Sequence, residues 1–412
     1  MNFGFYTYLV FIISWFTHLT ARFHVLGIIR FDLLILVVLF VTSFLRRKDI
    51  AAPPSATNKT FITLLIYIGI SLPFVYWPGS VIKKGTPEFI KAISFFYFTV
   101  NYITSEKKLN LFIKVFILCQ SFRIIEPLFL HITQGYWGDV AYMNSEEFMN
   151  RLSGAPNDIV NPNGLAFIVL TVFPFYYFLS IATAVNKLIF IPLMPMVIYT
   201  LLLTGSRSGF LGFILILFGI INKSKHKLIL FAIIIVAGII SFSYLGANFQ
   251  DRYKSIFSSK TKNSGTSEGR LSGLKEDFKV ALIRPVFGFG LGTSREANVH
   301  FRNRDQPSHN LYLETMQDLG LVGLFIFLLL IKSIISNFSL NQKLIKDRLS
   351  DSKGLFYLNS AMQVWLFMNI LFSFASYGLL GYEWYLFAGL SVVMKRIIET
   401  RDDFAPDPLI SA

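Results

Sequence analysis

Apolar runs close to the length of a membrane span follow one another along the chain, separated by polar connections. A helix that crosses a bilayer needs about 20 mostly apolar residues. Twelve runs approach this length, so both termini are expected on one side of the membrane. The runs cover 3–19, 25–44, 60–78, 88–104, 109–130, 163–184, 187–203, 208–222, 228–246, 319–337, 355–375 and 379–397.

Two connections are longer and more polar than the others. Residues 131–162 contain the Pro and Gly of irregular structure and five charged residues, Asp139, Glu146, Glu147, Arg151 and Asp158. Residues 247–309 form the longest hydrophilic stretch, in which 258–269 read as a flexible linker. The spacing over 270–283 predicts a helix that ends before Pro285 and carries one apolar face, made of Leu271, Leu274, Phe278 and Leu282.

These elements predict an all-α polytopic membrane protein with about twelve transmembrane helices. We expect helices one to nine within 1–246 and a long periplasmic loop with an amphipathic helix at 247–309. The last three helices and a cytoplasmic tail would fill 310–412. Met1 begins a retained first span rather than a secretory signal, because no positive side chain precedes the first apolar run.

Composition supports a membrane protein. The chain is 54% hydrophobic and 15% charged, whereas soluble domains carry about 25% charged residues. The mean hydropathy is +0.56. The single cysteine, Cys119, excludes a disulfide framework and a cysteine-based metal site.

The net charge of +14 is explained mainly by topology. Cytoplasmic loops of membrane proteins are rich in Lys and Arg, and no aromatic-interleaved basic module of a nucleic-acid binder is present. With both termini cytoplasmic, the outward-facing short connections hold few basic residues, namely Arg22, Lys83, Lys84, Arg151 and Arg207. The cytoplasmic connections hold many, for example Arg46, Arg47, Lys48, Lys107, Lys223, Lys346 and Arg396.

The long loop has an excess of positive charge that topology does not require. It contains eleven Lys or Arg against six Asp or Glu. A basic external loop suggests an anionic partner.

The segment Thr204–Gly209 is a run of small residues around one arginine. Small residues let the backbone approach a ligand closely, and the guanidinium of Arg207 matches phosphate oxygens. Ser206 lies beside it and is a candidate for substrate binding. The alternative is an interfacial arginine that only reaches toward the lipid headgroups.

Further candidates lie in or next to the two long connections. His309 precedes the tenth span and is followed by Asn310, a candidate for substrate binding. The imidazole of His309 can accept a proton from a hydroxyl group near neutral pH. A structural histidine that anchors the helix start is the alternative. Arg270 opens the loop helix, where a solvated surface charge is the alternative. Arg151 and Asn163 lie beside Asn-Pro and Asn-Gly turns, so they are weaker candidates for anion binding.

Several motifs are missing from the sequence. No Asp-x-Asp appears in an outward connection, and no His/Asp/Glu cluster has metal-ligand spacing. A GxxxxGK[ST] phosphate loop is also missing. We therefore expect no metal, no cofactor and no ATP, and a substrate already activated as a lipid diphosphate.

Four motifs occur in the order found in the O-antigen ligase/polymerase superfamily of bacterial envelope glycosyltransferases, which the chain resembles. They are Arg151-x-x-Gly154 with Asn161-Pro-Asn163, Gly205-Ser-Arg-Ser-Gly209, Arg270 before a helix that ends in Pro285-Val-Phe-Gly-Phe-Gly-Leu-Gly292, and His309-Asn310 with Gly320 and Gly323. The last is similar to a pattern associated with the ligases. The resemblance covers about 150–325; the first 150 residues resemble the family only as membrane helices.

This resemblance implies a GT-C-like membrane fold and an inverting glycosyltransferase in the bacterial inner membrane. Arg207 and Arg270 would bind the diphosphate of an undecaprenyl-linked glycan, and His309 would be the base. A polymerase would pass the glycan to another lipid-linked repeat unit, with a chain-length regulator protein as a partner, and a ligase would pass it to lipid A-core. The wide variety of polymerases in the family favours a polymerase.

Two other classes of function remain open. A transporter or flippase would place ionisable groups at mid-membrane, where Asp32 is the clearest example in this sequence. A passive scaffold would tolerate loss of Arg207 and His309.

Overall fold

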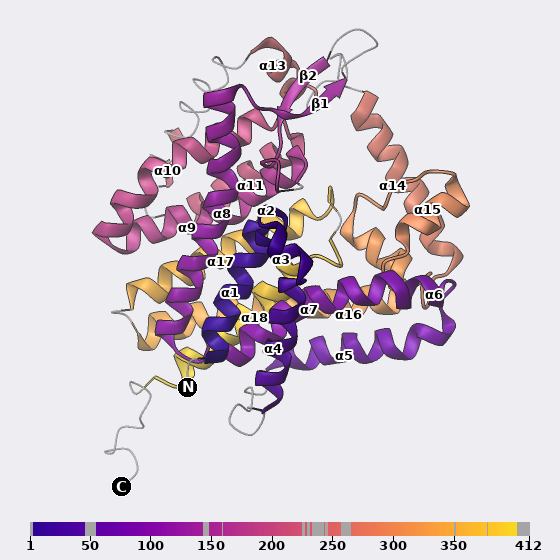
Figure 1. The fold of residues 1–412 in the computed structure, drawn as a ribbon, viewed down its shortest axis with the longest axis horizontal. Coiled ribbons are helices and arrows are strands. Elements are labelled where there is room, and N and C mark those ends of the chain that lie inside the picture. The colour runs from indigo at the N-terminus through magenta and orange to yellow at the C-terminus, as the bar shows by residue number, and fades with distance from the viewer. Residues whose placement is uncertain are drawn as a thin grey trace.

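A computed structural model describes residues 3–45, 55–142, 148–158, 160–224, 227–228, 231–232, 243, 246–256, 265–349, 352–376 and 378–401. Side chains are described for all of these except 141–142 and 265–271. The described part is almost entirely helical (Figure 1).

The helices follow the apolar runs of the sequence. The first group is α1 (Phe3–Thr17), α2 (Leu19–Arg22), α3 (His24–Ile28), α4 (Phe31–Leu45), α5 (Ala56–Ser71), η1 (Leu72–Phe74), α6 (Pro78–Ser80), η2 (Val81–Gly85), α7 (Thr86–Tyr102) and α8 (Glu106–Gln134). The second group is α9 (Pro162–Ala182), α10 (Ala184–Leu203), α11 (Arg207–Lys223), α13 (Ala247–Lys254), α14 (Gly265–Ile283), α15 (Ser294–Arg302), α16 (Leu311–Arg348), α17 (Lys353–Phe372) and α18 (Tyr382–Glu399).

Eleven of the twelve predicted runs coincide with a helix, and the ninth, 228–246, lies mainly outside the described residues. Five helices of the described chain, α8, α9, α10, α16 and α17, are long and apolar enough to cross a membrane. Helix α5 exposes an apolar stripe, Ile62, Ile66 and Ile70, each more than half exposed. Such a stripe on a packed helix suits contact with lipid. The chain is therefore a membrane-embedded helical protein, although the number of twelve spans stays a prediction.

The packed helices form a bundle with two distinct ends. At one end, the guanidinium of Arg396 donates to the carbonyl of Ile103 at 2.5 Å, and Lys108 lies over the ring of Phe5. The start of α1 and the end of α18 lie there, at the lower left of Figure 1. At the other end, which we name the loop end, lie the connections 135–161, 204–206, 284–310 and 373–381. Hydrogen bonds tie some of these connections together, such as that from Asn310 Nδ2 to Phe374 O at 3.2 Å.

The core is built from aromatic rings and aliphatic side chains of α1, α7, α9, α16, α17 and α18. Trp365 of α17 is fully buried and stacks on Phe387 of α18, with ring centroids 3.4 Å apart and planes at 10°. Helix α18 is buried over most of its length, so it is a central helix against which its neighbours pack.

The connection 131–162 was predicted to be irregular, but part of it is regular. Strands β1 (Gly138–Tyr142) and β2 (Phe148–Leu152) form an antiparallel hairpin in which Asp139 faces Arg151. The strands are five residues long and mix polar with apolar side chains, so they lack the alternation by which strands are predicted.

Helix α14 differs from its prediction at both its start and its faces. It begins at Gly265, so the prediction of a linker over 258–269 is wrong for 265–269. The prediction of a helix over 270–283 is confirmed. Its buried side chains include Asp277, Val280 and Ala281, whereas Phe278 and Leu282 of the predicted apolar face are nearly half exposed.

Helix α16 contains a break at Gly320, where φ is 69° and ψ is −175°. This backbone region is open essentially only to glycine. The carbonyls released by the break bind another segment: Gln317 O accepts from Phe289 N at 2.7 Å, and Asp318 O accepts from Gly290 N at 2.9 Å. The break therefore anchors the GFGLG segment at the loop end.

Candidate functional site

The tight turn between α10 and α11 contains the small residues that the sequence singled out. Gly205 has φ of 55°, and a Cβ there would lie 2.7 Å from Met149 Cε. Ser206 is the N-cap of α11, and its hydroxyl accepts from Gly209 N at 3.1 Å. Ser206 is fully buried, so its side chain shapes the turn.

Two arginines hold this turn from the side of the hairpin. Arg151 Nε donates to Thr204 O at 2.8 Å, and its Nη2 donates to Asn163 Oδ1 at 3.0 Å. Arg252 Nε donates to Gly205 O at 2.6 Å. Arg151 is only 8% exposed, so in this structure its guanidinium positions the turn. Arg252 was missed because nothing local in the sequence links α13 to Gly205.

Arg207 is the first residue of α11 and is half-buried. Its Nη1 donates to Ser255 Oγ at 2.9 Å, and that hydroxyl donates to Arg252 O at 2.6 Å. The hydroxyl of Tyr253 donates to Leu202 O at 3.1 Å, and burial raises the pKa of this phenol. Arg207 therefore lies on a well-anchored surface. The side chain of Arg270 lies outside the described residues, and only its place in α14 is known.

His309 and Asn310 have different surroundings at the start of α16. The side chain of Asn310 accepts from Tyr312 N and Leu313 N, both at 3.0 Å, and donates to Phe374 O at 3.2 Å. Asn310 thus caps and anchors the helix, the structural role that the sequence left open for His309. His309 is exposed and lies against two cavities.

The larger cavity, which we name the site cavity, has a volume of about 560 Å³. Asn163 of α9, Ser208 of α11 and His309 all line it. A smaller cavity of about 140 Å³ lies on the other side of His309, where Asp277 and Arg302 form a buried ion pair. The site cavity therefore brings Ser208, the residue after Arg207, and His309 to one space, whereas Arg207, Ser206 and Arg151 are not among the residues that line it. Among the described residues, no three His, Cys, Asp or Glu side chains come together as a metal site.

Two carboxylates on the first turns of α16 hold the loops around the site cavity. Asp318 accepts from Gly292 N at 2.7 Å and Thr293 N at 3.1 Å. Glu314 accepts from Gly378 N at 2.8 Å and Leu379 N at 3.1 Å. Sequence reasoning missed both, although two acids four residues apart beside an apolar run are a recognisable signal.

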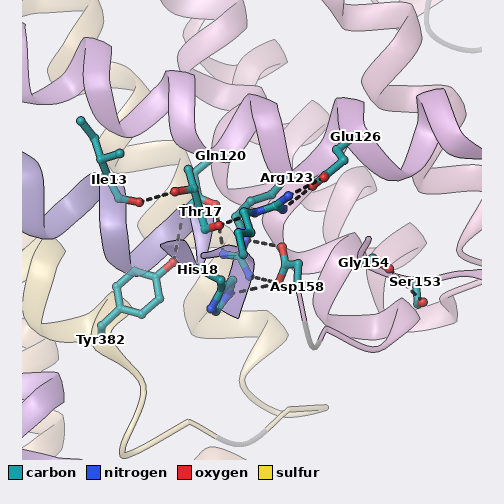
Figure 2. A network of polar contacts seen from close by, with 11 residues as sticks. Ile13, Thr17, His18, Gln120, Arg123, Glu126, Ser153, Gly154, Asp158 and Tyr382 are labelled. Carbon is teal, nitrogen blue, oxygen red and sulfur yellow. Dashed lines mark hydrogen bonds and ion pairs between the residues drawn. The ribbon is translucent and has the colours of Figure 1, made fainter. Parts of the chain in front are cut away.

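A buried ion network lies between α1, α8 and the 153–161 connection (Figure 2). Asp158 accepts from Arg123 Nε at 2.7 Å and Arg123 Nη2 at 3.0 Å, and its Oδ1 lies 3.2 Å from His18 Nε2. Burial by itself raises the pKa of Asp158, but His18 and Arg123 lower it to about 2. The network ties the connection that leads to Asn163 onto α8. Charged residues inside the apolar run 109–130 were the missed signal.

Comparison with known proteins agrees with the motifs. A family model described as O-Antigen ligase matches residues 192–328. None of the curated proteins compared with the chain matches it. The matched range includes the Gly205 turn, Arg270 and His309, but not Arg151 or Asn163. Over residues 192–328, this membrane-embedded chain is similar to the O-antigen ligase family, a match that supports the resemblance to the O-antigen ligase/polymerase superfamily.

Proposed function

We propose that the chain is a metal-independent, inverting glycosyltransferase that polymerises undecaprenyl-diphosphate-linked repeat units of a surface polysaccharide. The reaction would take place at the periplasmic face of the bacterial inner membrane, with both termini in the cytoplasm. The observation that carries the proposal is the site cavity, which brings Ser208, on the first turn of α11 beside Arg207, and His309 to one space.

The diphosphate would bind beside the Gly205 turn. Arg207 and Arg270 would neutralise the charge that grows on the departing diphosphate. Arg151 would act indirectly, because its contacts to Thr204 and Asn163 hold the turn in place. The N-terminus of α11, which begins at Arg207, adds a favourable field for an anion.

His309 would be the general base for the acceptor sugar. Its imidazole takes the proton of the attacking hydroxyl, whose oxygen forms a bond to the anomeric carbon of the donor. The bond from that carbon to the diphosphate breaks on the opposite face, and undecaprenyl diphosphate leaves with the electron pair. Attack opposite the leaving group inverts the anomeric centre. The exposure of His309 beside the site cavity supports this role.

The proposal is tested in cells by the length of the surface polysaccharide. Arg207→Ala, Arg270→Ala and His309→Ala should abolish long chains while the protein remains in the membrane, since each lost group costs about 10²-fold or more in rate. Lys279→Ala is a matched control on the same helix as Arg270, because its side chain is 71% exposed and forms an ion pair with Glu276 on the same helix. Normal chain length in all three site variants would refute the proposal.

A ligase that transfers the finished glycan to lipid A-core is the second candidate. The His309-Asn310 pattern with Gly320 and Gly323, and the description of the matching family model, favour it. A gel of surface polysaccharide from a deletion strain separates the two. Core with one repeat unit indicates a polymerase, whereas bare core with polymer on the carrier lipid indicates a ligase.

A further inference from the structure

The wall of the site cavity formed by α17 and α18 differs chemically from the wall beside the Gly205 turn. It carries Asn369, Glu383 and Trp384, which the proposed mechanism does not use. The basic side chains among the described lining residues are Arg295 and His309, and Arg295 forms two hydrogen bonds to Asp305, at 2.6 and 2.8 Å. Arg123 interacts electrostatically with Glu383, but it does not line the cavity and donates to both carboxylate oxygens of Asp158. A wall made of a carboxylate and an amide suits neutral hydroxyl groups better than a diphosphate.

Asn369 provides a hydrogen-bond donor that the protein does not use. The residue is 3% exposed, and its Nδ2 has no hydrogen-bond partner among the described residues. Leaving a buried amide group unpaired is costly, and nearly all buried polar groups in proteins have a partner. Because Asn369 lines the site cavity, a bound molecule is the partner that this donor fits.

Glu383 and Trp384 complete the set on the first turn of α18. The carboxyl group of Glu383 provides several acceptor positions, one of which meets the hydroxyl of Tyr382. Trp384 is 3% exposed and rests against Trp365 and Phe327, with ring centroids 6.4 and 5.7 Å away. A fixed aromatic surface with a few placed polar groups is the usual lining of a small-molecule site. A sugar ring, with apolar C–H faces and hydroxyl edges, matches this lining.

We propose that Asn369, Glu383 and Trp384 form a subsite that holds one sugar ring of the lipid-linked glycan, beside the bond that reacts. The amide of Asn369 donates to a ring hydroxyl, the carboxylate of Glu383 accepts from another, and Trp384 covers an apolar face. The proposal rests on the proposed function for the identity of the ligand. The ring belongs either to the donor or to the acceptor, since both present the same hydroxyl chemistry.

The subsite is tested by binding, independently of catalysis. The probe is the lipid-free repeat-unit oligosaccharide released from the surface polysaccharide of the host, titrated calorimetrically into protein in lipid nanodiscs. Asn369→Leu and Glu383→Gln should each weaken binding about 10-fold. Arg207→Ala should bind the oligosaccharide as the unaltered protein does and lose turnover. Unchanged binding in both subsite variants overturns the subsite, whereas full turnover by Arg207→Ala refutes the proposed function instead.

Asn337→Leu is the matched control. Asn337 is also a buried asparagine, 5% exposed, but its Nδ2 donates to Thr57 at 2.9 Å and Ser391 at 3.3 Å. Its loss should lower the unfolding temperature and leave oligosaccharide binding unchanged. In the described part of the chain, Nδ2 of Asn369 has no hydrogen-bond partner that Asn369→Leu would leave unpaired, so this variant should fold normally.

Steady-state kinetics of Asn369→Leu assign the ring. A raised KM for the lipid-linked donor places the ring on the donor, and a raised KM for the lipid-free oligosaccharide used as acceptor places it on the acceptor. Either result supports the subsite. Unchanged KM values for both substrates count against it.

Discussion

Replacing Asp158 with asparagine should destabilise the protein through Arg123. The change keeps the size of the side chain and removes its charge. Arg123 then keeps a guanidinium that is only 9% exposed, with its carboxylate partner lost. A buried charge without a partner is costly. We therefore expect Asp158→Asn to lower the free energy of unfolding and loosen the 153–161 connection from α8.

Two lines of reasoning give the size of the effect. The fall in the pKa of Asp158 from 3.8 to about 2 corresponds to about 2 kcal/mol of stability at neutral pH. Removing one partner of a buried ion pair typically costs about 3–5 kcal/mol. We expect a loss of about 2–4 kcal/mol, between these values, because asparagine can still accept a hydrogen bond from Arg123.

The same pKa predicts how stability depends on pH. The folded protein holds the pKa of Asp158 below its unfolded value, so the contribution is complete above about pH 4. It is lost as the pH falls toward 2. The unfolding temperature of the unaltered protein should therefore fall over this range by an amount that Asp158→Asn lacks.

The assay is thermal unfolding in lipid nanodiscs, followed by circular dichroism. A double-mutant cycle with Arg123→Met measures the coupling between the two residues, which should exceed 1 kcal/mol. Asp305→Asn is the matched control, because Asp305 also accepts two hydrogen bonds from one arginine but is 67% exposed. It should change the unfolding temperature little. A coupling near zero, or equal losses for Asp158→Asn and Asp305→Asn, would refute the reasoning.

Three further predictions concern the site. Gly320→Ala should misplace the GFGLG segment and lower activity and stability together, because a Cβ would lie 2.1 Å from Val286 O. Activity is measured as polysaccharide length and stability as the melting temperature, and normal values of both would contradict this prediction. Asp318→Asn should lower kcat about 10-fold or more while the protein remains in the membrane. The reason is that the carboxylate holds Gly292 and Thr293 beside the cavity. An unchanged kcat would mean that this loop does not position the substrate. EDTA should leave transfer in purified enzyme unaffected, and complete loss, restored by added metal, would show that the proposed metal independence is wrong.

The sequence predicted the helices well because a membrane span depends on local hydrophobicity alone. Eleven apolar runs became helices. The hairpin β1–β2 escaped prediction because pairing Asp139 with Arg151 is a non-local property of two short polar segments. The apolar face of α14 could be predicted from the sequence, but the exposure of that face could not, because burial depends on which helices lie beside it.

The candidate site was predictable only in part, for the same reason. Small residues around Arg207 and a histidine beside a span were visible locally, and one cavity joins their neighbourhoods. Arg252, Glu314 and Asp318 act on backbone groups far away in the sequence, so no local pattern reports them. Asn369 was missed because an isolated asparagine in an apolar run is also compatible with a helix-to-helix hydrogen bond, as Asn337 shows.

The segment from Pro285 to Gly292 has a consequence for insertions and deletions. Its backbone amides and carbonyls form hydrogen bonds with specific backbone groups elsewhere in the chain. Pro285 O accepts from Leu321 N, Phe289 N donates to Gln317 O, and Phe289 O accepts from Tyr76 N. These contacts use main-chain atoms, so they are indifferent to most side chains at the positions between the glycines. One added or deleted residue would shift every later partner by one position. Natural or engineered variants should therefore tolerate amino-acid substitutions in this segment, but not insertions or deletions.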